Sequence, residues 1–221
     1  MPDPVKTRAY RSTVRTAQAA GTRRAVLDAA RELFTSTGYA GTTVADVARV
    51  AGVSVDTVYT SVGRKPELLL AVHDMALAGG DEPVASEGRD YVAAIRAADG
   101  ARAKLEVYAL ALGERFPSVV PLGESLQVAA ERDPACRAAL EGLDARRAAN
   151  MLRMAAELRS TGEVRSELTD REVAHLLWTT NSTAFYRLAT SGGRGPGDYV
   201  AMVLDLWTRT LLTRRDDTAS D

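Results

Sequence analysis

The sequence lacks most of the residues and patterns on which covalent chemistry and membrane insertion depend. Its single cysteine, Cys136, cannot form a disulfide within the chain, which suits a reducing compartment. No stretch approaches the roughly 18 uninterrupted apolar residues of a membrane-spanning helix, and the N-terminus has no apolar signal core. We therefore expect a soluble, cytoplasmic protein.

Histidine is also scarce. His73 and His175 lie far apart, and neither has a Cys, Asp or Glu at metal-ligand spacing. No glycine-rich phosphate loop, zinc-ligand spacing or nucleophile elbow is present. Cys136 follows Pro134 at a predicted helix start, where a thiol can be activated, but a buried or idle thiol is the favoured interpretation. The sequence predicts no metal, no cofactor and no enzyme activity.

Charge is distributed unevenly along the chain. Residues 1–78 carry 10 Lys and Arg against 7 Asp and Glu, a net charge of +3, whereas residues 79–221 carry 18 against 22, a net charge of −4. The excess is greatest near the N-terminus, where only Asp3 opposes six basic residues: Lys6, Arg8, Arg11, Arg15, Arg23 and Arg24. Such a segment is either a solvated tail or a contact for a polyanion.

Helical spacing of apolar residues recurs between clusters of Gly and Pro, which predicts an all-α fold. Residues 1–21 lack a convincing apolar stripe and are interpreted as a basic arm, although VRTAQAA could extend a helix. A first helix is predicted from Thr22 to Thr37, where Gly38 ends it. Its buried face is formed by Val26, Leu27, Ala30, Leu33 and Phe34.

Two short helices joined by a glycine follow. Thr43 and Asp46 resemble the capping pair that opens a helix. Gly52 allows a tight turn, Ser54 caps the next helix, and Pro66 starts a fourth. This is the arrangement of a helix-turn-helix motif, whose second helix enters the DNA major groove. A purely structural helical hairpin is the alternative.

The clearest linker is GGDEPVASEG, which separates a helix-turn-helix domain of residues 22–78 from a second domain of residues 79–221. Beyond it, helices are predicted at about residues 88–98, 100–115, 119–131, 134–160, 170–190 and 197–213. The breaks between them fall at Pro117 with Pro121, at Asp133 with Pro134, at Gly162 and at GGRGPG.

The run TRRAVLDAARELFTSTGYAGTTVADVARVAGVSVDTVYTSVGRKPELLLAVHDMA resembles the N-terminal domain of the tetracycline-repressor (TetR) family of transcriptional regulators. The resemblance covers about residues 22–76. It rests on A-A-R-E-L-F, G-Y-x-x-T-T-V, D-V-A-x-x-A-G-V-S, T-V-Y and K-x-E-L-L, in this order. It implies an N-terminal three-helix domain with a helix-turn-helix and a C-terminal helical bundle for ligand binding and dimerisation.

The resemblance also implies a set of DNA-contacting positions: Thr43, Ser54, Thr57, Tyr59, Thr60, Ser61 and Lys65. Hydroxyl and ammonium groups near helix N-termini can hold phosphates, and those on the second helix of the motif can reach base edges. Val55 can contact a thymine methyl. Capping or solvent exposure is the alternative for each hydroxyl, and for Ser54 capping is favoured.

The sequence departs from the family pattern within the recognition helix. Val55 and Asp56 stand where Lys-Gly is common, and Thr60, Ser61 and Val62 replace the usual aromatic or His and Phe. The helix therefore contains no Lys or Arg. We expect the attraction to DNA to come from basic residues outside it: Arg49, Arg64, Lys65, Arg8, Arg11 and Arg15.

The second domain carries the patterns of an interface and of a pocket. Predicted helices 170–190 and 197–213 each have two apolar faces, which favours a two-fold four-helix interface over a central helix of one core. The candidate ligand contacts are Tyr108, Phe116, Gln127, Met151, Met154, Trp178, Asn181 and Phe185; plain core is the alternative for each. The polar block TTNST, residues 179–183, could bond a ligand or a second subunit.

Together these patterns predict a homodimeric DNA-binding transcriptional regulator, a repressor that responds to an unknown small-molecule effector at a palindromic operator. The alternative is a helical small-molecule-binding protein or enzyme whose helix-turn-helix is only structural.

Overall fold

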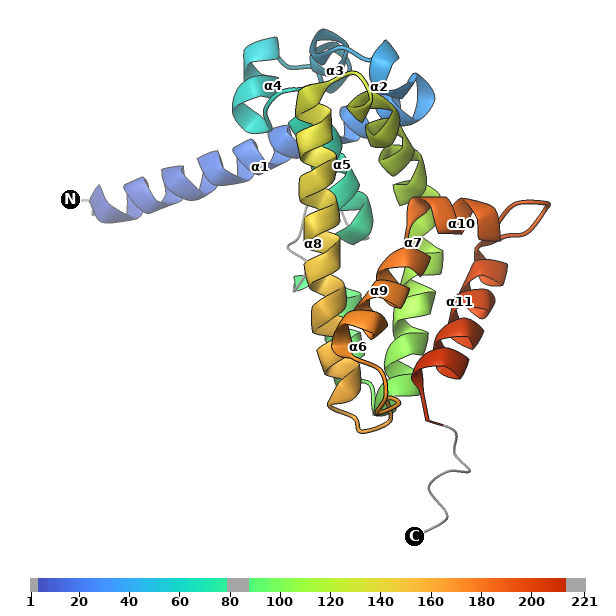
Figure 1. Cartoon of the computed structure of the whole chain (residues 1–221). Helices are drawn as coiled ribbons and strands as arrows, with labels where there is room; N and C mark the ends of the chain where they lie inside the picture. The colour runs from blue at the N-terminus through green and yellow to red at the C-terminus, as the bar shows by residue number, and fades with distance from the viewer. Residues whose placement is uncertain (1–3, 79–87, 214–221) are drawn as a thin grey trace.

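The computed structural model describes residues 4–78 and 88–213, with the side chains of residues 15–78 and 88–213. Over these ranges the chain forms eleven helices and no strand beyond one isolated bridge between Val164 and Leu212 (Figure 1). The predicted all-α fold is confirmed. Nearly all of the predicted linker lies outside the described residues.

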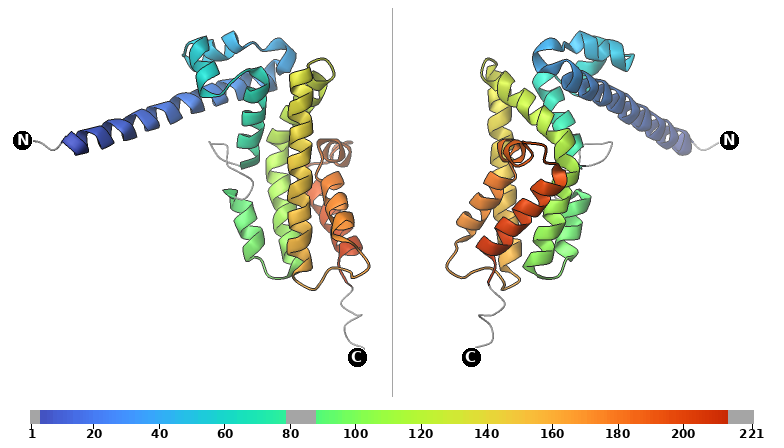
Figure 2. Two further views of the ribbon diagram at one scale, coloured as in Figure 1. Left: turned by 60° about the vertical axis from the view of Figure 1, so that its left-hand side comes forward. Right: turned by 90° about the vertical axis from the view of Figure 1, so that its right-hand side faces the viewer.

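The first helix, α1, runs from Pro4 to Ser36, so it begins well before the predicted start at Thr22. The segment interpreted as an arm continues the same helix and projects from the body of the molecule (Figures 1 and 2). Pro4 suits a first helical position, and no proline interrupts the following residues. Propagating an existing helix requires no new nucleus, so an apolar stripe is not needed there.

Four helices complete the N-terminal part: α2 at Gly38–Gly41, α3 at Val44–Ala51, α4 at Val55–Ser61 and α5 at Lys65–Ala78. Gly38 adopts a φ of 78°, as expected for the glycine that ends α1. One hydrophobic core joins these helices, built from residues such as Val26, Phe34 and Val58. The same core continues into the second domain through Leu122 and Leu126.

The second domain begins with α6 at Asp90–Ala97, α7 at Gly100–Ala130 and α8 at Pro134–Arg159. The break predicted at Pro117 and Pro121 was wrong, because α7 continues through both prolines. Proline removes its own amide hydrogen bond and bends a helix. Both prolines lie exposed while the other faces of α7 are buried along most of its length, so packing outweighs the lost hydrogen bonds.

Three further helices close the bundle: α9 at Asp170–Thr180, α10 at Thr183–Ala189 and α11 at Pro196–Leu211. The single helix predicted over residues 170–190 was wrong, because the chain breaks at Asn181 and Ser182. The Ser182 hydroxyl accepts a hydrogen bond of 3.1 Å from the Phe185 amide and so caps a new helix. The polar block TTNST is therefore a helix boundary.

The inner face of α11 contains Tyr199, Val203, Trp207 and Leu211, all of them buried. They pack in a second core with α7, α8 and α9. The outer side of the same region exposes Met202 to 38% and Leu188 of α10 to 73%.

Candidate functional site

The helix-turn-helix forms as its local signals predict. The Thr43 hydroxyl accepts from the Asp46 amide at 3.1 Å, and the Asp46 carboxylate accepts from the Thr43 amide, which completes a capping box. Gly52 ends α3 with a φ of 68°, a left-handed conformation that favours glycine. The Ser54 hydroxyl accepts from the Thr57 amide and starts α4.

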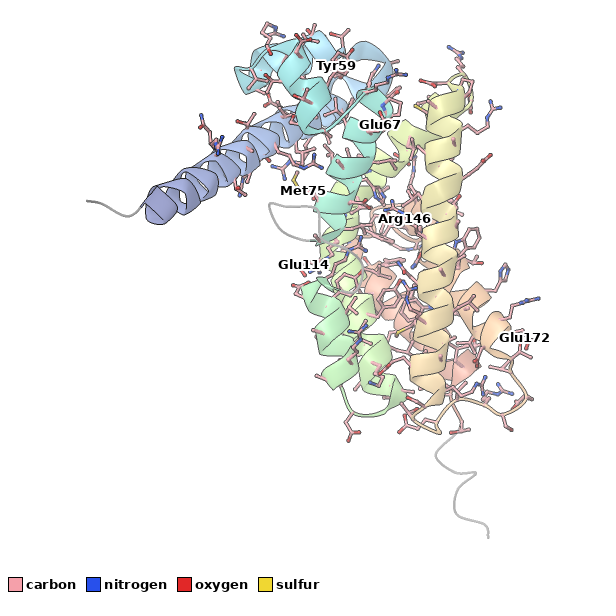
Figure 3. All side chains as sticks on the ribbon, turned by 90° about the vertical axis from the view of Figure 1, so that its left-hand side faces the viewer. Tyr59, Glu67, Met75, Glu114, Arg146 and Glu172 are labelled. Atoms are coloured by element: carbon pink, nitrogen blue, oxygen red, sulfur yellow. The ribbon has the colours of Figure 1, made fainter. Side chains whose placement is uncertain are left out.

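One side of α4 is anchored and the other is open. Val58 is fully buried in the domain core, whereas Tyr59 is 48% exposed and Val55 37% exposed. Asp56 and Thr60 are exposed as well. Figure 3 shows Tyr59 at the end of the molecule formed by the helix-turn-helix, away from the α7–α8 bundle. An exposed helix face of this kind can be laid into a groove.

The hydroxyls of the predicted site are engaged with their own backbone. Thr60 donates to the Asp56 carbonyl at 2.9 Å, and Ser61 donates to the Val58 carbonyl at 3.3 Å. Ser54 and Thr57 lie 2.8 Å apart, oxygen to oxygen. Each oxygen keeps acceptor capacity for DNA amino groups. The capping role expected for Ser54 is observed, as is a capping role for Thr43.

The three basic residues predicted near the motif lie on α3, between α4 and α5, and at the start of α5. Arg49 is exposed and lies 3.5 Å from Asp46, and Arg64 is exposed between α4 and α5. The Lys65 ammonium lies 4.0 Å from the centroid of the Tyr39 ring. Burial lowers the pKa of Lys65.

The basic residues predicted on the N-terminal segment belong to α1. Arg15 is exposed there. Arg8 and Arg11 lie in the part of α1 whose side chains are outside the described residues.

Arg23 has a role that the sequence did not suggest. In the sequence, Arg23 is counted among the basic residues near the N-terminus. In the structure, Arg23 of α1 donates a hydrogen bond to the Ser61 carbonyl at the end of α4. A cation at a helix C-terminus satisfies a free carbonyl and favours the helix dipole. Arg23 thus fixes the C-terminal end of α4 to α1.

Residues 26–72 match the family model of bacterial regulatory proteins of the tetR family. This stretch holds α3, α4 and the capping and turn residues just described. The chain carries the DNA-binding domain of the TetR family. It is a DNA-binding transcriptional regulator.

Solved structures extend this likeness to the fold of most of the chain. A TetR-family transcriptional regulator from Rhodococcus sp. is 22% identical, with 86% of this chain and 98% of that chain covered and a TM-score of 0.64. A regulator from Saccharomonospora viridis, solved with choline, is 18% identical over 87% and 98%, with a TM-score of 0.65. The regulator FadR from Bacillus subtilis, solved with stearoyl-CoA, is 19% identical over 82% and 95%, with a TM-score of 0.62. No curated protein matches the chain.

A cavity of about 300 Å³ lies beside the DNA-binding domain, lined by Arg89, by residues of α5, α6, α7 and α8, and by Asn181 and Thr183. Six of the eight predicted ligand residues line it: Tyr108, Phe116, Gln127, Met151, Met154 and Asn181. Figure 3 shows side chains filling the space between α5 and α6 on one side and α8 on the other. Their role as ligand contacts stays a prediction.

Trp178 and Phe185 do not line the cavity. On one continuous helix they would share a face with Asn181, but the break at Ser182 ends that register. Trp178 instead stacks on His175 with ring centroids 6.2 Å apart, and Phe185 packs edge-on against Tyr199.

Asn181 organises the polar side of the cavity wall. Its side-chain amide group donates to the Tyr108 hydroxyl, and its side-chain oxygen accepts from Arg147 at 2.6 Å. Arg147 also pairs with Asp144 at 2.9 Å. Burial raises the pKa of Tyr108, so its hydroxyl stays protonated and can donate to a ligand.

Charged residues of the cavity wall were missed by sequence reasoning, notably His73, Arg89 and Arg147. Arg89 follows directly on the predicted linker, whose polar and glycine-rich composition gave no sign that the next residue is buried. His73 was considered only as a metal ligand. It lies four residues after Leu69 on the apolar stripe of α5, a spacing that could have indicated its burial.

The described residues contain no cluster of three His, Cys, Asp or Glu side chains that could hold a metal ion. Nor is any helix among them long and apolar enough to span a membrane.

Proposed function

We propose that the chain is a homodimeric, ligand-responsive repressor that binds a palindromic operator through α4. The observation that supports this most is the position of α5. Leu68, Leu69 and Val72 of α5 pack in the helix-turn-helix core, whereas His73 and Leu77 line the cavity. A ligand that changes the cavity wall therefore acts directly on a helix that supports the recognition motif.

The junction between the two domains is tightly packed beside α5. Tyr39 of α2 accepts a hydrogen bond from the Cys136 thiol at 2.9 Å, and its ring stacks against Phe34. Burial raises the pKa of Cys136, which keeps it a thiol and not a reactive thiolate. Because of this packing, a movement of α7 and α8 at their junction near Cys136 would be transmitted to the DNA-binding domain through Tyr39.

Regulation requires that the ligand prefer one conformation. A ligand with equal affinity for the DNA-binding and the released conformations shifts nothing. For a dimer, the two copies of α4 must lie about 34 Å apart to enter successive major grooves. We propose that ligand binding moves α5 and changes this separation.

A two-fold interface formed by α9, α10 and α11 would supply the dimer. Leu188 and Met202 remain exposed after the chain has packed its own core, and such apolar positions favour association. Analytical sedimentation of the wild type should give twice the monomer mass. The double variant Leu188→Glu with Met202→Glu should sediment with the mass of one monomer. A wild-type monomer at micromolar concentration contradicts this interface.

DNA binding is tested by selecting operators from a random DNA pool and measuring affinity by fluorescence anisotropy. Thr60→Ala should weaken binding to the selected site by about tenfold, the effect of removing one hydrogen bond to a base edge.

The matched control for this test is Thr35→Ala. The Thr35 hydroxyl is also exposed and bonds the carbonyls three and four residues earlier, but it lies on α1. Equal effects of the two substitutions contradict recognition by α4. Failure of the wild type to select any sequence favours the alternative of a structural hairpin.

A further inference from the structure

Two buried polar side chains of the cavity wall have atoms without a partner. His73 is 5% exposed and Arg89 is 7% exposed, and both line the cavity. His73 Nδ1 and Arg89 Nε make no hydrogen bond with any described residue. Buried polar atoms in folded proteins are nearly always paired, so an unpaired couple in a cavity wall indicates a missing partner.

The charges around these two atoms favour an anion as the partner. Arg89 Nη2 lies 3.9 Å from the Asp74 carboxylate, too far for a hydrogen bond. Asp74 is closer to Arg146, at 3.1 Å, and lies 3.9 Å from His73 Nδ1. The Asp74 carboxylate is thus the shared neighbour of two arginines and a histidine. Its single negative charge does not balance the two arginines, so this end of the cavity keeps a positive charge.

The two acids that line the cavity, Asp144 and Glu157, cannot supply the missing charge. Asp144 pairs with Arg147 at 2.9 Å, and Glu157 pairs with Lys104 at 2.8 Å. The lining contains four arginines against these two acids, a net charge of +2 with His73 neutral: Arg89, Arg96, Arg147 and Arg153.

Much of the remaining wall is apolar, although uncharged polar residues such as Gln127, Asn181 and Thr183 also line it. Beyond the charged residues, the cavity is lined by Leu77, Ile95, Leu112, Phe116, Val119 and Met154. A ligand that satisfies both parts has one acidic head and an apolar body.

We propose that the effector is a small amphipathic carboxylate whose head group binds His73 and Arg89. Arg89 offers its guanidinium N–H groups and His73 offers Nδ1–H, and both can donate to one carboxylate. The related folds do not decide this question, since one was solved with choline, a cation, and another with stearoyl-CoA, an anion. The charge preference follows from the residues of this chain.

The proposal rests on the proposed ligand-responsive function and adds a mechanism to it. Asp74 and His73 are neighbours on α5, and Asp74 joins α5 to Arg146 of α8. A ligand carboxylate at His73 and Arg89 competes with Asp74 for the same hydrogen-bond donors. Binding therefore changes how α5 is held, and α5 reaches the helix-turn-helix core.

The test uses the full chain without DNA and three probes with the same ten-carbon body: decanoate, decanol and decyltrimethylammonium. Calorimetric titration of the wild type should show decanoate binding at least about tenfold more tightly than the other two, as expected for charged hydrogen bonds. Arg89→Gln should remove this preference, and Arg89→Lys should retain part of it. Arg102→Gln, a change on the exposed side of α7, is the matched control.

Equal binding of the three probes, tighter binding of decanol or the ammonium, or no binding by decanoate overturns the proposal. So does a preference that survives in Arg89→Gln. If that variant does not fold, the selectivity of the wild type still decides. Adding decanoate to the operator complex is a separate measurement: binding without release of DNA supports the anion site and contradicts the regulatory function.

Discussion

Asp74→Asn tests whether the Asp74 cluster holds α5 in place. Burial tends to raise the pKa of Asp74, but the neighbouring His73 and Arg146 outweigh it, so the net pKa lies below its ordinary value. The folded protein therefore prefers the ionised form. Asn keeps the shape of the side chain and removes its charge.

The expected loss of stability follows from the geometry. Unit charges 3.9 Å apart, as for Asp74 and Arg89, interact by about 4 kcal/mol at an effective dielectric constant of about 20. The cost of burying both groups offsets part of this. The Arg146 side chain is 52% exposed, so that pair adds at most about 1 kcal/mol. We expect the variant to be less stable by about 2 kcal/mol.

The assay is urea unfolding followed by circular dichroism, at one protein concentration because a dimer's stability depends on it. Asp28→Asn is the control, since Asp28 pairs with Arg31 at 3.3 Å on the partly exposed side of α1, outside the proposed dimer interface, and should cost about 0.5 kcal/mol or less. Asp74→Asn should also bind decanoate more tightly, because it removes a competing carboxylate. Equal stability losses for the two variants, or weaker decanoate binding by Asp74→Asn, would refute the reasoning.

Three further predictions concern the rest of the chain. Lys104→Met should cost about 3 kcal/mol in urea unfolding, because it leaves Glu157 and the last carbonyls of α6 unpaired; a loss below about 1 kcal/mol contradicts it. The hydrogen bond from the Thr43 hydroxyl lowers the pKa of Asp46, so its stabilisation is complete above the unfolded pKa of about 3.9 and is lost as pH falls through the folded value. Wild type and Asp46→Asn should therefore converge in acid melts, and a constant difference argues against the capping box. Deleting residues 1–18 should flatten the salt dependence of operator binding by close to one unit for each phosphate that the segment neutralises, and an unchanged slope means that the segment touches no DNA.

The helix-turn-helix could be predicted from sequence because its signals are local. The capping box of Thr43, the turn at Gly52 and the cap at Ser54 depend only on residues three or four positions apart. The fold class followed from apolar spacing for the same reason. Pattern alone located these elements to within about two residues.

Two of the errors arose where distant contacts outweigh local preference, and one arose from the local cap at Ser182, which was not recognised. Pro117 and Pro121 predicted a break, yet the burial of α7 keeps the helix continuous. The polar residues near Asn181 were interpreted as an interruption within one helix, and they divide two. The cavity charges were missed because Arg89 meets His73 only when α5 and α6 fold together.

Because α1 is continuous, the rotation of its N-terminal segment about the helix axis is fixed relative to the rest of the helix. At 1.5 Å per residue, the 18 residues from Pro4 to Gly21 form a rod about 27 Å long. Positions 8, 11 and 15 recur at steps of three and four, so they share one side of that rod. Inserting one alanine after Ala20 would turn this side by about 100° without changing its charge, whereas a flexible tether would be indifferent to the insertion. The segment therefore has a fixed orientation in addition to its basic charge.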